Sequence, residues 1–128
     1  MPRPRDRYGR PLAPDAPTAQ ITPPAPEREN ITSAEAWGEA INYLNVDLPF
    51  HAHEVFEQRW RCCPPAERDC WRALAQWGAA LTHLARGNPK GSRDVALRAG
   101  ELLGNCTIIA PVDREFVLDS LARLITCK

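Results

Sequence analysis

The chain has 128 residues, of which 44% are hydrophobic and 25% are charged, and these values predict one globular domain. Its 16 basic residues balance its 16 acidic residues, which argues against nucleic acid as the partner and leaves a homodimer open. No apolar run approaches the roughly 18 residues of a membrane span, and the N-terminus lacks the apolar segment of a secretory signal. An odd count of five cysteines fits reduced thiols, so we expect a cytoplasmic protein without membrane contact.

The first 30 residues differ in composition from the rest of the chain. They hold eight of the thirteen prolines and few large apolar residues. Such a segment cannot bury enough apolar surface to offset its conformational entropy. We therefore predict a disordered tail at residues 1–30 and a helical domain at residues 31–128.

Two helices are predicted at the start of the domain. Thr32 and Glu35 have the spacing of a capping box, which opens the first helix. Asp47 is the expected cap of a second helix, in which Pro49 occupies the first turn. That helix is expected to run to about Arg61.

Three more helices follow. The third begins at Pro65, continues to Arg86 and stops at the sequence Gly87-Asn88-Pro89. The fourth is expected from about Lys90 to Leu103, with Gly104 as its stop, and the fifth opens at Pro111 and Asp113 and carries Val117, Leu121 and Leu124 inward. No segment alternates with period two for long enough to predict a strand, so the fold class is all-α.

The third helix has two apolar arcs. One contains Cys70, Leu74, Trp77, Leu81 and Leu84, and its neighbour contains Ala73, Gln76, Ala80 and His83. A helix buried on two sides belongs at the centre of a bundle, and the small residues, Gly78 among them, would let another backbone approach closely. The prediction is a single bundle of about five helices around this helix.

The second helix carries the most informative polar residues. At about 100° per residue, one side contains Phe50, His53, Phe56, Glu57 and Trp60. This places His53 and Glu57 in the middle of an apolar face, while His51 and Glu54 point away from it. A buried titratable pair must be hydrogen-bonded, so these two residues should contact each other or a common partner.

Three interpretations of the pair remain open. His53 and Glu57 could bond each other and a group such as Gln76 or His83, and so fix the register of the helices. They could instead line a pocket for a ligand. Or they could bind a divalent metal ion together with His83.

The metal interpretation has a weakness in the sequence itself. The segment reads His53-Glu54-x-x-Glu57, so it lacks the second histidine of the zinc-protease motif. Glu54 would have to serve as the general base. The cysteines do not indicate a redox or metal site, because Cys62 and Cys63 form no Cys-x-x-Cys pair. Cys70 is expected to be a small buried hydrophobic residue.

The sequence resembles the family known as domain of unknown function 309, which includes small bacterial, archaeal and plant proteins. The resemblance rests on three segments between about residues 34 and 104: Pro49-Phe50-x-Ala52-His53-Glu54-Val55-x-Glu57-x-x-Trp60, Trp71-Arg72-x-Leu74-x-Gln76 with Ala79-Ala80-Leu81-x-His83, and Arg86-Gly87-Asn88 with Gly91. The tail, with Asp6-Arg7-x-Gly9-Arg10-Pro11, is similar to the extension of actinobacterial members.

The resemblance implies a compact helical fold and supplies no activity. It does single out a set of polar and aromatic residues as a shared site: His53, Glu54, Glu57, Trp60, Gln76, His83, Arg86 and Asn88. We therefore expect a helical module that binds a small ligand or a protein partner through His53, Glu57 and His83, more readily than an enzyme. The alternative is a small metal-dependent hydrolase that uses the same three side chains as metal ligands.

Overall fold

The structure is a computed structural model that describes residues 3–106 and 111–126. Its five α-helices are α1 (Ser33–Asn45), α2 (Pro49–Cys62), α3 (Arg68–Ala85), α4 (Pro89–Gly104) and α5 (Arg114–Thr126), with short 3-10 turns at Thr18–Gln20 and Pro65–Glu67. Within the described residues, the extended pairing amounts to one isolated bridge between Arg5 and Pro11. The all-α prediction is confirmed.

Most helix ends follow the sequence signals, although α3 begins at Arg68 rather than at Pro65, and Gly104 is the last residue of α4 rather than its stop. The capping box forms, because Thr32 accepts a hydrogen bond from the Glu35 backbone at 3.1 Å and Glu35 accepts one from the Thr32 backbone at 3.0 Å. At α2, however, the capping residue is Leu48, which makes no side-chain cap bond. Asp47 has φ of 60° and accepts a hydrogen bond from the Tyr8 hydroxyl at 2.6 Å, so the prediction that it caps α2 was wrong.

The predicted stop of α3 at Gly87 is confirmed in detail. The backbone N–H of Gly87 donates to Leu84 O at 3.0 Å, and that of Asn88 donates to His83 O at 2.9 Å. This is the Schellman arrangement, which needs a left-handed residue after the helix. Gly87 supplies it with φ of 77°. The turn holds Asn88 directly beside His83.

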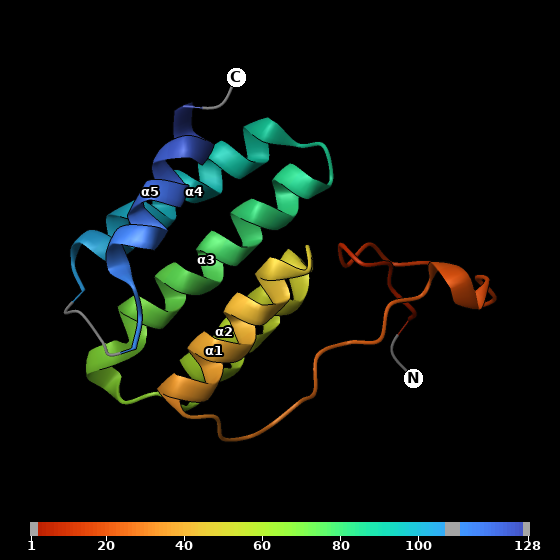
Figure 1. The fold of residues 1–128 in the computed structure, drawn as a ribbon, viewed down its shortest axis with the longest axis horizontal. Helices are drawn as coiled ribbons and strands as arrows, with labels where there is room; N and C mark the ends of the chain where they lie inside the picture. The colour runs from red at the N-terminus through yellow and green to blue at the C-terminus, as the bar shows by residue number, and fades with distance from the viewer. Residues whose placement is uncertain (1–2, 107–110, 127–128) are drawn as a thin grey trace.

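Helix α3 lies between two helical pairs (Figure 1). It packs against α2 on one side and against α4 and α5 on the other, while α1 covers α2 and α4 packs on α5. The predicted bundle around the third helix is therefore confirmed. None of the helices in the described residues is both long and apolar enough to cross a membrane.

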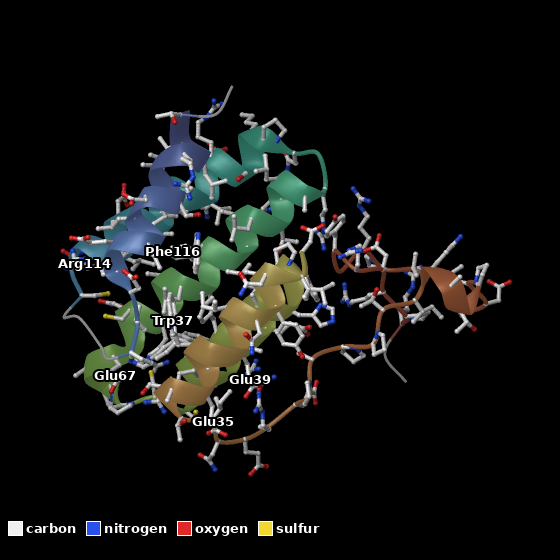
Figure 2. All side chains as sticks on the ribbon, in the orientation of Figure 1. Glu35, Trp37, Glu39, Glu67, Arg114 and Phe116 are labelled. Atoms are coloured by element: carbon white, nitrogen blue, oxygen red, sulfur yellow. The ribbon has the colours of Figure 1, made fainter. Side chains whose placement is uncertain are left out.

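Aromatic side chains join the two halves of the bundle. Trp77 is stacked with Trp37 of α1 at 6.4 Å between ring centroids, and Phe116 of α5 meets it edge-on at 6.0 Å. Figure 2 shows Trp37 and Phe116 reaching toward α3 from opposite sides. The Trp77 indole is buried and donates to Ser120 Oγ at 2.9 Å, which satisfies its polar atom.

The two apolar arcs predicted for α3 are buried along most of their length. Cys70, Leu74 and Trp77 of the first arc are buried, as are Ala73 and Ala80 of the second. Leu84 is an exception, since it is 38% exposed. It lies in the last turn of α3, where the two arcs are no longer covered. Val117, Leu121 and Leu124 of α5 are buried as predicted.

The N-terminal segment lies against α1, α2 and the end of α3 through hydrogen bonds. His51 Nε2 donates to Pro23 O at 2.6 Å, and Gln58 Nε2 donates to Pro26 O at 2.8 Å. Arg28 forms two hydrogen bonds of 2.7 Å with the Glu39 carboxylate. These contacts belong to residues 3–30 as the structure describes them, and the disorder of the tail in solution stays a prediction.

Candidate functional site

The buried face of α2 is rotated relative to the predicted one. Its centre consists of Ala52, Val55 and Phe56, all of which have 0% exposure. His53 lies at the edge of this face, and the Glu57 side chain is 43% exposed. The prediction that both occupy its middle was wrong, because α1 and α3 bury the Ala52 side of the helix.

His53 and Glu57 nevertheless pair as expected. His53 Nε2 lies 3.2 Å from Glu57 Oε1, across one turn of α2. The hydrogen bond from His53 holds the pKa of Glu57 below its usual range, against the opposing effect of partial burial. His53 Nδ1 is buried and has no hydrogen-bond partner among the described residues. The pair leaves one nitrogen of the imidazole available.

The position of His53 depends on a close approach of α2 to α3. A Cβ atom added to Gly78 would lie 2.9 Å from His53 Cα and 3.0 Å from its backbone nitrogen. Real Cβ atoms essentially never come this close, so the two helices pack at this distance because residue 78 has no side chain. The expectation that Gly78 admits a neighbouring backbone is confirmed.

A small cleft opens beside His53, between α2 and the last turns of α3. It has a volume of about 150 Å³ and is lined by Phe50, His53, Ala79, Thr82, His83 and Arg86. The cleft thus brings together His53, His83 and Arg86, three of the predicted site residues. Its lining contains no carboxylate. We call it the His53 cleft.

Asn88 fixes His83 at the rim of the His53 cleft. Asn88 Oδ1 accepts the Gly91 N–H at 3.0 Å and so caps α4. This orients the amide so that its Nδ2 faces His83 Nδ1 at 3.2 Å. Since an amide nitrogen donates and cannot accept, His83 Nδ1 is the acceptor and its Nε2 carries the proton. Gly91 leaves room for this contact, because a Cβ there would lie 2.3 Å from Asn88 Nδ2.

Arg86 is held by the N-terminal segment and by Phe50. Its Nε donates to Tyr8 O at 2.8 Å, and its guanidinium carbon lies 5.8 Å from the Phe50 ring centroid. Burial lowers the pKa of Arg86 below its ordinary value, with the positive charges of Arg5 and Arg10 acting in the same direction. Its terminal N–H groups make no further hydrogen bond within the described residues. The guanidinium is therefore partly buried, and its terminal N–H groups are open to solvent or to a ligand.

The other predicted site residues lie elsewhere. Glu54 lies under the N-terminal segment, in a separate cleft. Trp60 lies near the C-terminal end of α2, where the Arg68 guanidinium stacks over its ring at 5.4 Å. Gln76 is half-buried and, like Glu57, does not line the His53 cleft. Sequence reasoning placed these residues in one site, and the structure does not bring them together.

The predicted metal centre receives no support from the geometry. The described residues contain no group of three or more His, Cys, Asp and Glu side chains that could hold a metal ion. Glu57 turns to His53, while His83 turns to Asn88. The three proposed ligands, His53, Glu57 and His83, thus belong to two separate hydrogen-bonded pairs. The metal-dependent hydrolase stays a prediction, and the geometry offers no set of ligands for its metal ion.

Sequence reasoning missed His51, Gln58 and Phe50. His51 and Gln58 are both 4% exposed and are covered by the proline-rich segment, whose carbonyl oxygens they bind. A signal was present, because these two polar residues stand seven positions apart on one side of α2, and prolines leave carbonyl acceptors without adjacent N–H donors. Phe50 contacts the N-terminal loop as well as His53.

None of the cysteines in the described residues lines the His53 cleft. Cys70 is buried, as predicted, and Cys62 and Cys63 are half-buried at the end of α2. Burial raises the pKa of Cys63, and burial next to Cys70 raises that of Cys106 to about 12. Raised pKa values disfavour the reactive thiolate. Cys127 lies outside the described residues.

Comparison with known proteins agrees with the resemblance drawn from the sequence. Residues 37–95 match the family described as domain of unknown function (DUF309). This range contains α2 and α3, and with them every side chain that lines the His53 cleft. Searches of curated proteins and of solved structures each found no significant match. The match therefore confirms, over residues 37–95, the resemblance to the DUF309 family.

Proposed function

We propose that the DUF309 domain of this chain is a binding module for a small anionic ligand, held in the His53 cleft. The observation that carries the proposal is the convergence of His53, His83 and Arg86 on a cleft without a carboxylate in its lining. A carboxylate or phosphate group accepts hydrogen bonds and carries negative charge, which matches this set of donors. The ligand is a small molecule that presents such a group.

Each of the three polar side chains has a nitrogen to offer. His83 carries its proton on Nε2, because Nδ1 accepts from Asn88. Arg86 keeps its terminal N–H groups, since its Nε alone is used by Tyr8 O. His53 Nε2 is engaged by Glu57, and its Nδ1 has no hydrogen-bond partner among the described residues.

The size and walls of the cleft limit the ligand. A volume of about 150 Å³ is smaller than the roughly 300 Å³ at which sites for drug-sized molecules begin. The Phe50 ring and the Ala79 methyl group add apolar surface to the lining of the cleft. The cleft therefore fits one acidic group with a few attached carbons, and it leaves the rest of a larger ligand in solvent.

The remaining parts of the hypothesis concern context. We place the protein in a reducing cytoplasm, on the odd number of cysteines. A protein partner that inserts an acidic side chain or a C-terminal carboxylate into the His53 cleft would satisfy the same chemistry. A second copy of the chain could present such a carboxylate as well.

The test is calorimetric titration of the full chain with inorganic phosphate and with acetate, followed by the same titrations of His83→Ala and Arg86→Lys. We expect weak, saturable binding of at least one anion and a loss of about tenfold or more in affinity for each variant, because each loses a directional donor. Arg98→Gln is the matched control, since Arg98 is exposed on α4 and outside the cleft. The proposal would be refuted if neither anion showed saturable binding, or if all variants bound with the same affinity as the native protein.

A further inference from the structure

A second cleft lies on the other side of Phe50, between α2 and the N-terminal segment. It has a volume of about 340 Å³, which is in the range of small-molecule sites. Helix α2 contributes Phe50, His51 and Glu54 to its lining, and residues between Arg3 and Glu27 form the rest. Much of the surface is apolar and includes Ile21, Pro24 and the Phe50 ring.

His51 brings an unpartnered acceptor to this second cleft. The side chain is more than nine-tenths buried, with 4% exposure. Its Nε2 lies 2.6 Å from Pro23 O, and because a carbonyl can only accept, Nε2 carries the proton. In the neutral imidazole, Nδ1 then holds a lone pair. Nδ1 is buried and has no hydrogen-bond partner in the described residues.

Glu54 adds a second acceptor, three residues further along the same helix. Its Oε1 is buried and lacks a hydrogen-bond partner in the described part of the chain. Burial raises the pKa of Glu54, while the charges of His51, His53 and Arg5 and the backbone N–H of Ala25 lower it. Residues three apart lie on neighbouring positions of a helix surface, so His51 and Glu54 lie on one wall of the cleft.

Each of the two arginines that line this cleft donates to a backbone carbonyl of the N-terminal segment. Arg5 Nη1 donates to Gly9 O at 2.6 Å, and its guanidinium lies over the Phe50 ring at 5.5 Å. Arg3 Nε donates to Leu12 O at 3.0 Å. Asp6 and Glu27 add two further carboxylates to the lining. Neither arginine donates to His51 Nδ1 or Glu54 Oε1, so these two acceptors lack a hydrogen-bond donor among the described residues.

We propose that this cleft binds a small organic amine, whose ammonium group donates to Glu54 Oε1 and His51 Nδ1 and whose apolar body lies against Phe50 and Ile21. An ammonium group supplies up to three N–H donors and the charge that a desolvated carboxylate lacks. An anion would satisfy neither acceptor. The site differs from the His53 cleft in its location and in the sign of the charge on its ligand. The two proposals can therefore be tested independently.

The N-terminal segment forms most of this cleft, so the ligand and the segment hold each other in place. Arg5 and Arg7 lie in this segment and are cleavage points for trypsin, since neither is followed by proline. A bound amine buries its body between α2 and the segment, so it should slow cleavage at these arginines. This readout reports occupancy of the cleft without reference to any activity.

The experiment titrates the full chain with n-butylammonium chloride by calorimetry, with sodium n-butyrate as the matched acid of equal size. We expect saturable binding of one amine per chain, at least about tenfold weaker affinity in Glu54→Gln, and slower trypsin cleavage of the N-terminal segment with the amine. Glu101→Gln is the control, because Glu101 is exposed on α4. Binding should persist in the presence of inorganic phosphate.

Three results would overturn this inference. One is the absence of saturable binding by the amine. Another is butyrate binding as tightly as butylammonium, because the cleft would then recognise the carbon chain alone. The third is an unchanged amine affinity in Glu54→Gln, a variant that keeps the size of the side chain and removes its charge.

Discussion

The Cα atom of His53 occupies the space that a side chain on Gly78 would need, since a Cβ atom there would lie 2.9 Å from it. This contact sets how closely α2 packs on α3, and it also sets the position of the imidazole in the His53 cleft. Gly78, which has no side chain, therefore determines the geometry of the His53 cleft.

Gly78→Ala should destabilise the protein by about 1 to 3 kcal/mol, although alanine is the better helix former. The colliding atoms belong to the backbone of α2, which cannot rotate away as a side chain could. Chemical denaturation measures the change. Gly38→Ala in α1 and Gly100→Ala in α4 are the controls, because a Cβ at either position meets nothing within 4 Å. Each control should stabilise by about 0.5 to 1 kcal/mol, and equal effects at all three sites would contradict the account.

Glu57 should stabilise the folded protein at neutral pH. Its folded pKa is lowered by the hydrogen bond from His53, so its contribution is present above the ordinary value of 4.5 and disappears as the pH falls through the folded pKa. Glu57→Gln should therefore lower stability at pH 7 by less than about 1 kcal/mol, because the pair is half-exposed. The difference should vanish once the pH is far enough below 4.5 to protonate the carboxyl in both the folded and the unfolded state. Melting curves across this range measure it, and a deficit that persists in acid would contradict the pairing.

Glu54, one turn away, should behave in the opposite way. Burial raises its folded pKa above the ordinary value of 4.5, so the ionised group costs stability above that range. Glu54→Gln should raise stability at pH 7 by less than about 1 kcal/mol and have no effect once the carboxyl is protonated in both states. A loss of stability at pH 7 would show that Glu54 has a partner that pairs with its charge.

His83 should carry its proton on Nε2 when neutral. Asn88 can only donate to Nδ1, because its Oδ1 already accepts the Gly91 N–H. Nitrogen-15 shifts of the imidazole at pH 8 reveal the tautomer. Asn88→Asp keeps the cap acceptor and removes the donor, so the preference for Nε2–H should weaken. Asn105→Asp, at the end of α4, should leave His83 unchanged, and an Nδ1–H tautomer in the native protein would refute this arrangement.

The fold could be predicted well because each helix has local signals. Prolines, a capping box and glycine stops mark most of the boundaries, and the 3.6-residue period marks the buried faces of α3 and α5. Asp47 shows the limit of such signals. Its place before Pro49 suits a cap, but a tertiary contact with Tyr8, 39 residues away, uses its carboxylate instead.

The site was predicted less well, because a single helix does not reveal which elements cover it. His53 was assigned to the centre of the α2 face, and His51 was assigned to its outside. The structure reverses this order, since the N-terminal segment buries His51 through Pro23 O. A segment whose composition predicts disorder offers no periodicity from which its packing could have been inferred.

The central claim, that an anion binds in the His53 cleft, is tested most directly by imidazole resonances of the full chain during titration with inorganic phosphate. The account predicts saturable shifts for His53 and His83, which line the cleft, and none for His51, which lies under the N-terminal segment. Unshifted His53 and His83 resonances at saturating phosphate, or shifts of equal size in all three histidines, would contradict it.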